Sequence, residues 1–152
     1  MLFRSFLSVD FSRLTGRRLY RSRNLNAPFP GSGQLPFPGA GNMNQIETSG
    51  MLENKSLTVT FHTQAGKRLD FHTQYTLAKT RDDTSGPFAF PANPYDLRGE
   101  FGRSDLDRRH RWVWMGMLRL PWRMRSSSVV TLLSGVPFNV TTGRDDNRDS
   151  IV

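Results

Sequence analysis

The sequence predicts an all-β protein: a fragment of an antiparallel up-and-down transmembrane β-barrel, with about six strands and long loops on one side. Two observations carry this prediction. Several segments alternate between apolar and polar side chains, as strands do when one face meets lipid and the other a watery lumen. The connections between these segments are short turns or long loops, and the two kinds alternate along the chain.

The composition narrows the class of protein. Mean hydropathy is -0.52 and no run of apolar residues is long enough for a transmembrane helix. A barrel strand needs only about 9–11 residues, so a membrane strand stays possible. Cysteine is absent, which excludes a disulfide framework, a thiol nucleophile and a cysteine-based zinc site.

The net charge of +8 and the pI near 11.0 come almost entirely from arginine. Nucleic acid is therefore one partner to consider. The arginines are spread over turns, loops and strand faces, however, and form no single basic block. This distribution weakens the nucleic-acid interpretation.

The N-terminal part predicts a hairpin followed by a loop. Residues 2–11 alternate as a half-buried strand, residues 12–17 contain a glycine suited to a turn, and residues 18–23 return as a second strand. The first residues lack the features of a secretory signal. Residues 24–44 are rich in proline and glycine, which predicts either a functional loop or a disordered linker.

The middle of the chain predicts a clear hairpin. Odd-numbered positions from Leu57 to Thr63 and from Leu69 to Leu77 are mostly apolar, and the even-numbered positions are polar. Residues 66–68 form the turn. A hairpin of a soluble sandwich would show similar alternation, so the pattern alone does not separate it from a membrane hairpin.

The C-terminal part predicts a long polar loop and two more strands. Residues 80–109 form the loop, residues 110–122 a fifth strand and residues 128–142 a sixth, both with apolar even-numbered positions. Trp112 and Trp122 lie near opposite ends of the fifth strand, where interfacial aromatic girdles are expected. Tryptophan in a buried core is the alternative.

The lengths of the connections favour the membrane alternative. The turns after Phe11, Gln64 and Trp122 are short, whereas those after Arg23, Lys79 and Val140 are long or reach the end of the chain. Short turns at one end of the strands and long loops at the other are typical of outer-membrane barrels.

Several segments together resemble the barrel of TonB-dependent outer-membrane receptors, specifically the Oar-like group with a carboxypeptidase-regulatory-like domain. They are residues 17–28 (Arg-Arg-Leu-Tyr-Arg-Ser-Arg-Asn-Leu-Asn-Ala-Pro), the hairpin 57–79 ending Tyr-Thr-Leu-Ala-Lys, residues 93–112 beginning Asn-Pro-Tyr-Asp-Leu-Arg-Gly-Glu-Phe-Gly, Leu-Pro-Trp at 120–122, and residues 132–147. The resemblance implies energised uptake of a scarce nutrient through a plugged lumen. It also implies location in the cell outer membrane and, as partners, outer-membrane lipid, the rest of the barrel, the plug domain and the TonB system.

Residues 1–152 are thus expected to be part of such a barrel, without a plug domain, a TonB-contacting segment or a C-terminal closing strand. Plugged transporters need about 22 strands, so we expect these residues not to close a barrel alone and to leave unpaired edge strands.

The search for chemistry yields few candidates, and we expect no enzyme activity, no catalytic residues, no cofactor and no metal. Across a three-residue turn His62 and His72 would face each other, but two ligands do not make a zinc site. Residues 105–111 place acids beside arginines as a charged loop base, either orienting the loops or forming surface ion pairs. Candidate ligand contacts on an external loop are Phe88, Phe90 and Tyr95. Half of a calcium-loop pattern is present at Asp145, Asn147 and Asp149, and a solvated polar loop is the alternative.

The main hypothesis is therefore a non-enzymatic segment of an outer-membrane receptor with no nucleic-acid partner. The rival hypothesis is a small soluble basic β-protein that binds nucleic acid through arginine and exposed aromatic residues. Dependence on detergent separates the two, since only the rival folds as a soluble protein.

Overall fold

A computed structural model describes residues 3–138 and confirms the all-β fold class. The strands form one antiparallel, open sheet in the order β1-β2-β3-β5-β6, with β4 paired to β3. Among the described residues no helix is both long and apolar enough to cross a membrane. The elements are β1 (Phe3–Asn24), β2 (Asn44–Ala65), β3 (Leu69–Asp82), the 3₁₀-helix η1 (Leu97–Gly99), β4 (Gly102–Arg103), β5 (His110–Arg119) and β6 (Arg125–Leu133).

The chain divides into two compact units, each described by itself below. The first, here called the strand unit, comprises residues 3–13, Asn54–Lys79 and Leu106–Val136. The second, here called the loop unit, comprises Leu14–Glu53, Thr80–Asp105 and residues 137–138. Both tight turns belong to the strand unit, and the two long connections, 25–43 and most of 83–109, belong to the loop unit.

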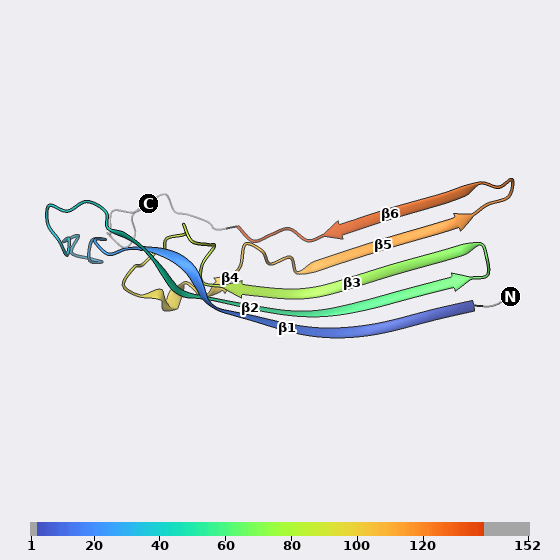
Figure 1. Ribbon diagram of the computed structural model, residues 1–152, viewed down its shortest axis with the longest axis horizontal. Helices are drawn as coiled ribbons and strands as arrows, with labels where there is room; N and C mark the ends of the chain where they lie inside the picture. Colours follow the sequence, from blue (N-terminus) through green and yellow to red (C-terminus); the bar gives the residue numbers. More distant parts are fainter. Residues whose placement is uncertain (1–2, 139–152) are drawn as a thin grey trace. The chain divides into compact units, whose positions relative to one another are not determined.

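The register within the strand unit brings the apolar positions of neighbouring strands together. Leu69 pairs with Leu118 and Tyr75 with Trp112, and Trp112 pairs in turn with Leu132. The strands lie side by side in Figure 1. Since side chains alternate between faces, odd positions of β3 and even positions of β5 and β6 share one face. That face carries Leu69, Phe71, Tyr75, Leu77, Trp112, Trp114, Leu118, Val130 and Leu132.

This apolar face is not covered by other parts of the described chain. Trp112 is 45% exposed and Leu132 is 52% exposed. Among residues 3–138 no Val, Leu, Ile, Met or aromatic side chain is buried, and Ala27 is the one buried residue of the hydrophobic class. A soluble β-protein needs a buried apolar core, so this arrangement argues against the nucleic-acid-binding rival.

The predicted hairpin at residues 12–17 is wrong, because β1 continues through this segment to Asn24. In the strand unit the Ser5 and Thr63 hydroxyls form a hydrogen bond, and so do those of Ser12 and Ser56. The chain therefore stays paired with β2 where a turn was expected. The glycine there, Gly16, sits inside the strand, and Arg18 two positions later has a left-handed backbone, with φ +58°.

The two tight turns connect β2 to β3 and β5 to β6. The first is the predicted turn at residues 66–68, with Gly66 at φ +57°. In the second, Met124 N–H donates to the Pro121 carbonyl at 3.3 Å, and both central residues have positive φ. Those residues are Trp122 and Arg123, and positive φ at both is typical of a type I′ turn.

The predicted extents of the last two strands need correction. Strand β5 ends at Arg119, so Trp122 lies in the turn, 87% exposed, and not on the strand as a girdle residue. Strand β6 ends at Leu133, before the predicted end at residue 142. Pro137 interrupts any continuation because it lacks the N–H that a ladder requires. Residues 139–142 lie outside the described residues.

Candidate functional site: a polar cavity in the loop unit

The two long loops of the loop unit are held together by aromatic and polar contacts. The rings of Phe29 and Tyr95 stack with centroids 5.1 Å apart, and the Tyr95 hydroxyl donates to the Ala27 carbonyl. The Asn26 side chain donates to three carbonyls of residues 37–41 and accepts from Phe37 N–H. The segment predicted as loop or linker is therefore an ordered loop.

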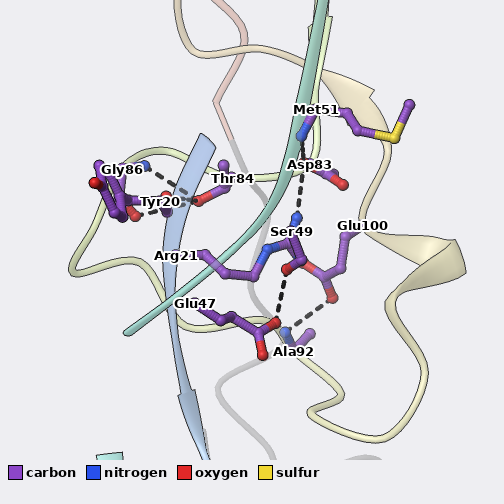
Figure 2. Close-up of polar contacts among 10 residues, drawn as sticks. All are labelled: Tyr20, Arg21, Glu47, Ser49, Met51, Asp83, Thr84, Gly86, Ala92 and Glu100. Atoms are coloured by element: carbon purple, nitrogen blue, oxygen red, sulfur yellow. Dashed lines mark hydrogen bonds and ion pairs between the residues drawn. The ribbon is translucent and has the colours of Figure 1, made fainter. Parts of the chain in front are cut away.

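A buried ion pair lies where β1, β2 and the end of β3 meet (Figure 2). Arg21 is 1% exposed, and its Nη2 lies 2.7 Å from Asp83 Oδ1. The same carboxylate oxygen accepts a hydrogen bond of 2.6 Å from Met51 N–H. Asp83 thus links one side chain of β1 to the backbone of β2, which stabilises the base of the long loop that follows β3.

Further polar contacts fix the backbone around this pair, as Figure 2 shows. The Ser49 hydroxyl donates to Glu47 Oε1 at 2.7 Å. Glu100 Oε1 accepts from Ala92 N–H at 2.9 Å, across the long loop. The Thr84 hydroxyl lies within hydrogen-bonding distance of the Tyr20 carbonyl and accepts from Gly86 N–H.

Arg21, Asp83, Thr84, Ala92 and Glu100 border a cavity of about 610 Å³ in the loop unit. Its walls combine acidic side chains, guanidinium groups and an apolar section. The acidic residues are Asp82, Asp83, Glu100 and Asp105; the arginines are Arg21 and Arg103; the apolar section includes Ala89, Phe90, Pro91 and Phe138.

The electrostatics of the cavity follow from this crowding of carboxylates. Burial raises the pKa of Asp82 above its usual value of 3.8, a hydrogen bond from the Ser104 hydroxyl opposes the rise, and the nearby carboxylates of Asp105 and Asp83 add to it. Asp96, in the same long loop but not at the cavity, shows the opposite effect. Hydrogen bonds from the Arg98 side chain and backbone lower the pKa of Asp96 to about 2.

The structure does not bring the three aromatic candidates into one site. Phe90 borders the cavity. Phe88 is 81% exposed and is not among the cavity's lining residues. Tyr95 joins the two long loops through Phe29 and Ala27. The calcium-loop candidates Asp145, Asn147 and Asp149 lie outside the described residues.

The expected facing of His62 and His72 is confirmed, with ring centroids 6.0 Å apart. His62 Nε2 also lies 2.9 Å from Asp70 Oδ1. Within residues 3–138 no group of three or more potential ligands is placed to hold a metal ion. At the predicted charged loop base, Asp107 is fully buried, so this acid is not part of a surface network.

Sequence reasoning missed Arg21, Asp83 and Glu100 as site residues. Arg21 is one of several arginines in its segment, Asp83 follows Asp82, and Glu100 lies between Arg98 and Arg103, so nothing in the local pattern marks them as site residues. Their positions near strand ends that border long loops are the one signal that was present.

An antiparallel sheet with an uncovered apolar face, tight turns and long ordered loops is what a section of a transmembrane β-barrel shows. The chain belongs to the outer membrane beta barrel domain family, whose profile matches residues 4–151. This membership places the protein in the outer membrane. No curated protein and no solved structure matches the chain.

Proposed function

We propose that the chain is a segment of a TonB-dependent outer-membrane receptor that takes up a nutrient at the expense of cellular energy. In this function the long loops capture the ligand and the polar face of the sheet lines its path. The protein is not an enzyme. The plug domain and the TonB system are the partners that the proposal requires.

The observation that carries the proposal is the sorting of the connections. β2 and β5 each begin at a long loop and end at a tight turn, and β3 begins at a tight turn and ends at a long loop. The long loops are ordered by their own contacts, and the loop after β3 supplies most of the lining of a polar cavity large enough for a small ligand. A barrel that serves only as a membrane anchor has no need of such loops.

Strand length supports the same proposal. β1 and β2 each contain 22 residues, whereas crossing the hydrocarbon core takes about 9–11. Each of these strands is therefore about twice as long as the membrane requires. The surplus gives the loops a rigid base outside the hydrocarbon, which suits capture of a dilute ligand.

The edges of the sheet indicate that more strands are needed. Among the described strands, β1 and β6 stand at the two ends of the strand order. Unpaired backbone groups are not tolerated in lipid, so both edges require further strands of the same barrel. Plugged transporters have about 22 strands, and the remaining ones are expected from the parent protein.

Uptake measurements in cells test the proposal. Cells with and without this barrel are given a mixture of isotopically labelled nutrients, and uptake of each component is followed by mass spectrometry. We expect one component to depend on the barrel and its uptake to stop when an uncoupler collapses the proton gradient. Barrel-dependent uptake that continues with the uncoupler would indicate a passive pore and refute the proposal, and so would the absence of any barrel-dependent component.

A further inference from the structure

We propose that three basic residues at one end of the apolar face, Arg13, Lys55 and Lys79, bind the phosphate groups of a glycolipid in the outer leaflet of the membrane. They belong to β1, β2 and β3 and are here called the cationic row. The inference uses the outer-membrane location of the chain and not energised uptake, so either proposal can fail without the other.

A hydrogen bond between two serines places the first two cations opposite each other. The Ser12 and Ser56 hydroxyls lie 2.8 Å apart, and such short side chains meet only from directly opposite positions of two strands. A second hydroxyl pair, nearer the tight turn, has the same register. In an antiparallel pair the next position of β1, Arg13, therefore lies opposite Lys55.

A contact between two threonines places the third cation in the same row. The Thr58 and Thr76 hydroxyls lie 3.1 Å apart, which puts Lys55 opposite Lys79. Lys79 occupies an odd position of β3 and thus the apolar face, and the whole row shares that face. All three cations are exposed. Since adjacent strands lie about 4.8 Å apart, the row extends over about 10 Å.

The cationic row begins where the uncharged part of the apolar face ends. Alternate residues of 3–11, 57–65 and 69–77 supply this face in the first three strands, and none of them is charged. Segments of this length match the about 9–11 residues that a strand needs to cross the hydrocarbon core. Lysine and arginine are costly in the middle of a bilayer but not at its surface. The cations are therefore expected at the level of the lipid headgroups.

Aromatic side chains mark the same level of the membrane. The Tyr75 hydroxyl lies 2.7 Å from His110 Nδ1, and the two rings stack with centroids 6.1 Å apart. Tyr75 pairs with Trp112, and His110 pairs with Leu77, the last apolar position before the cationic row. Tyrosine and tryptophan gather at membrane–water interfaces, because their rings are apolar and their hydrogen-bonding groups are polar. This is a second indication, independent of the cations, that the headgroups lie here.

The charge of this face is complementary to phosphate. The acidic residues of the strand unit are Asp10, Asp70 and Asp107. Asp10 and Asp70 occupy even positions of β1 and β3, on the opposite face, and Asp107 is fully buried. No acidic residue of the strand unit therefore stands on the face of the cationic row. Arginine and lysine bind phosphate oxygens through charge-assisted hydrogen bonds.

The position of the row at one end of the strands selects the lipid. In outer-membrane barrels the short turns face the periplasm. The row lies at the end away from the two tight turns and therefore meets the outer leaflet. Lipid A, the membrane anchor of lipopolysaccharide in that leaflet, is a disaccharide with a phosphate group at each end. Its headgroup suits a row of cations about 10 Å long, whereas a phospholipid offers one phosphate to part of the row.

Lipid binding to the purified barrel tests the inference. The whole barrel is extracted from outer membranes, freed of copurified lipid in a non-ionic detergent and titrated with diphosphoryl lipid A. Native mass spectrometry measures the lipids bound per barrel. We expect saturable binding of diphosphoryl lipid A, and binding at least 10-fold weaker for monophosphoryl lipid A and for phosphatidylglycerol. This comparison needs no variant.

A triple variant connects the binding to the cationic row. Arg13→Gln, Lys55→Gln and Lys79→Gln together should weaken binding of diphosphoryl lipid A at least 10-fold and remove the preference over the monophosphoryl form. The exchange Arg13→Lys, Lys55→Arg and Lys79→Arg keeps the charge and should keep the preference. A folded barrel migrates differently from its unfolded form in SDS gels of unboiled samples, which shows whether each variant folds.

The matched control removes the same charge from the opposite face. Arg4, Arg111 and Arg125 are exposed and stand on that face of β1, β5 and β6. Their triple replacement by glutamine should bind lipid A as the unmodified barrel does.

Three results would overturn the inference. Equal binding of diphosphoryl lipid A and phosphatidylglycerol would mean that any anionic lipid suffices. Equal weakening by the row variant and the control variant would mean that net charge attracts the lipid and the row does not. Unchanged binding in a folded row variant would place the lipid elsewhere.

Discussion

Removing one partner of the buried Arg21–Asp83 pair should destabilise the loop unit more than removing both. Asp83→Asn keeps an oxygen for Met51 N–H but leaves the guanidinium, 1% exposed, without its counter-charge. Loss of one member of a buried ion pair costs about 3–5 kcal/mol. Arg21→Met leaves a carboxylate that is 11% exposed and still bonded to Met51, so we expect a smaller loss, about 2–3 kcal/mol.

The double variant Arg21→Met with Asp83→Asn should come within about 1 kcal/mol of the unmodified protein, because no uncompensated charge stays buried. The free energy of unfolding is measured by urea titration in detergent micelles, followed by far-ultraviolet circular dichroism. The double-mutant cycle then yields the coupling between the two side chains. The account would be refuted if each single variant lost less than about 1 kcal/mol of unfolding free energy and the two losses were additive in the double variant. That result is typical of an exposed ion pair and not of a buried one.

Three further predictions concern the backbone and the cavity. Gly50→Ala should lower the free energy of unfolding by about 1–3 kcal/mol, because the added Cβ would lie 2.6 Å from Thr84 Cγ2. Gly41→Ala is the control and should leave stability unchanged, because a Cβ there would have no atom within 4 Å. Urea titration measures both variants. Asp82→Asn should raise the free energy of unfolding at pH 7, because the raised pKa of Asp82 means that the folded state favours the neutral form of this side chain. Measured across pH, the stability difference between the variant and the unmodified protein should vanish below pH 3.8, where the carboxyl is protonated in both the folded and the unfolded state. Arg123→Gly should raise the free energy of unfolding by up to about 1 kcal/mol, because glycine adopts the left-handed backbone at φ +60° without strain. The same urea titration measures it, and a lower stability of the variant would refute the assigned turn.

The sequence predicted the faces of the strands well, because a period of two specifies which side chains share a face. The facing of His62 and His72 followed from the length of one turn. The hairpin at residues 12–17 failed because a glycine signals a turn only where the chain has no neighbouring strand to pair with. The ladder with β2 decided between turn and strand, and that ladder joins residues far apart in sequence.

A short turn was expected after Trp122, but the turn includes Trp122 itself together with Arg123, and its type was not expected. Type I′ turns favour asparagine and glycine, and neither residue here is of that kind. The cavity could not be predicted from local sequence patterns either, because its residues come from separate segments of the chain. Arg21 lies in β1 and Asp83 directly after the end of β3, and the two meet only through the fold. Phe88, Phe90 and Tyr95, in contrast, are neighbours in sequence that the loop places apart.

The central claim is that one face of the strand unit meets lipid and the other does not, and site-directed spin labelling tests it directly. The chain contains no cysteine, so single cysteines can be introduced and labelled without interference. In β3 and β5 the register places Phe71 and Trp114 on the apolar face and the paired residues His72 and Met115 on the opposite face. In lipid bilayers, labels at Phe71 and Trp114 should collide with oxygen, and labels at His72 and Met115 with a water-soluble nickel chelate. Labels at Phe71 and Trp114 that are shielded from both reagents, or equally open to the nickel chelate, would contradict the account.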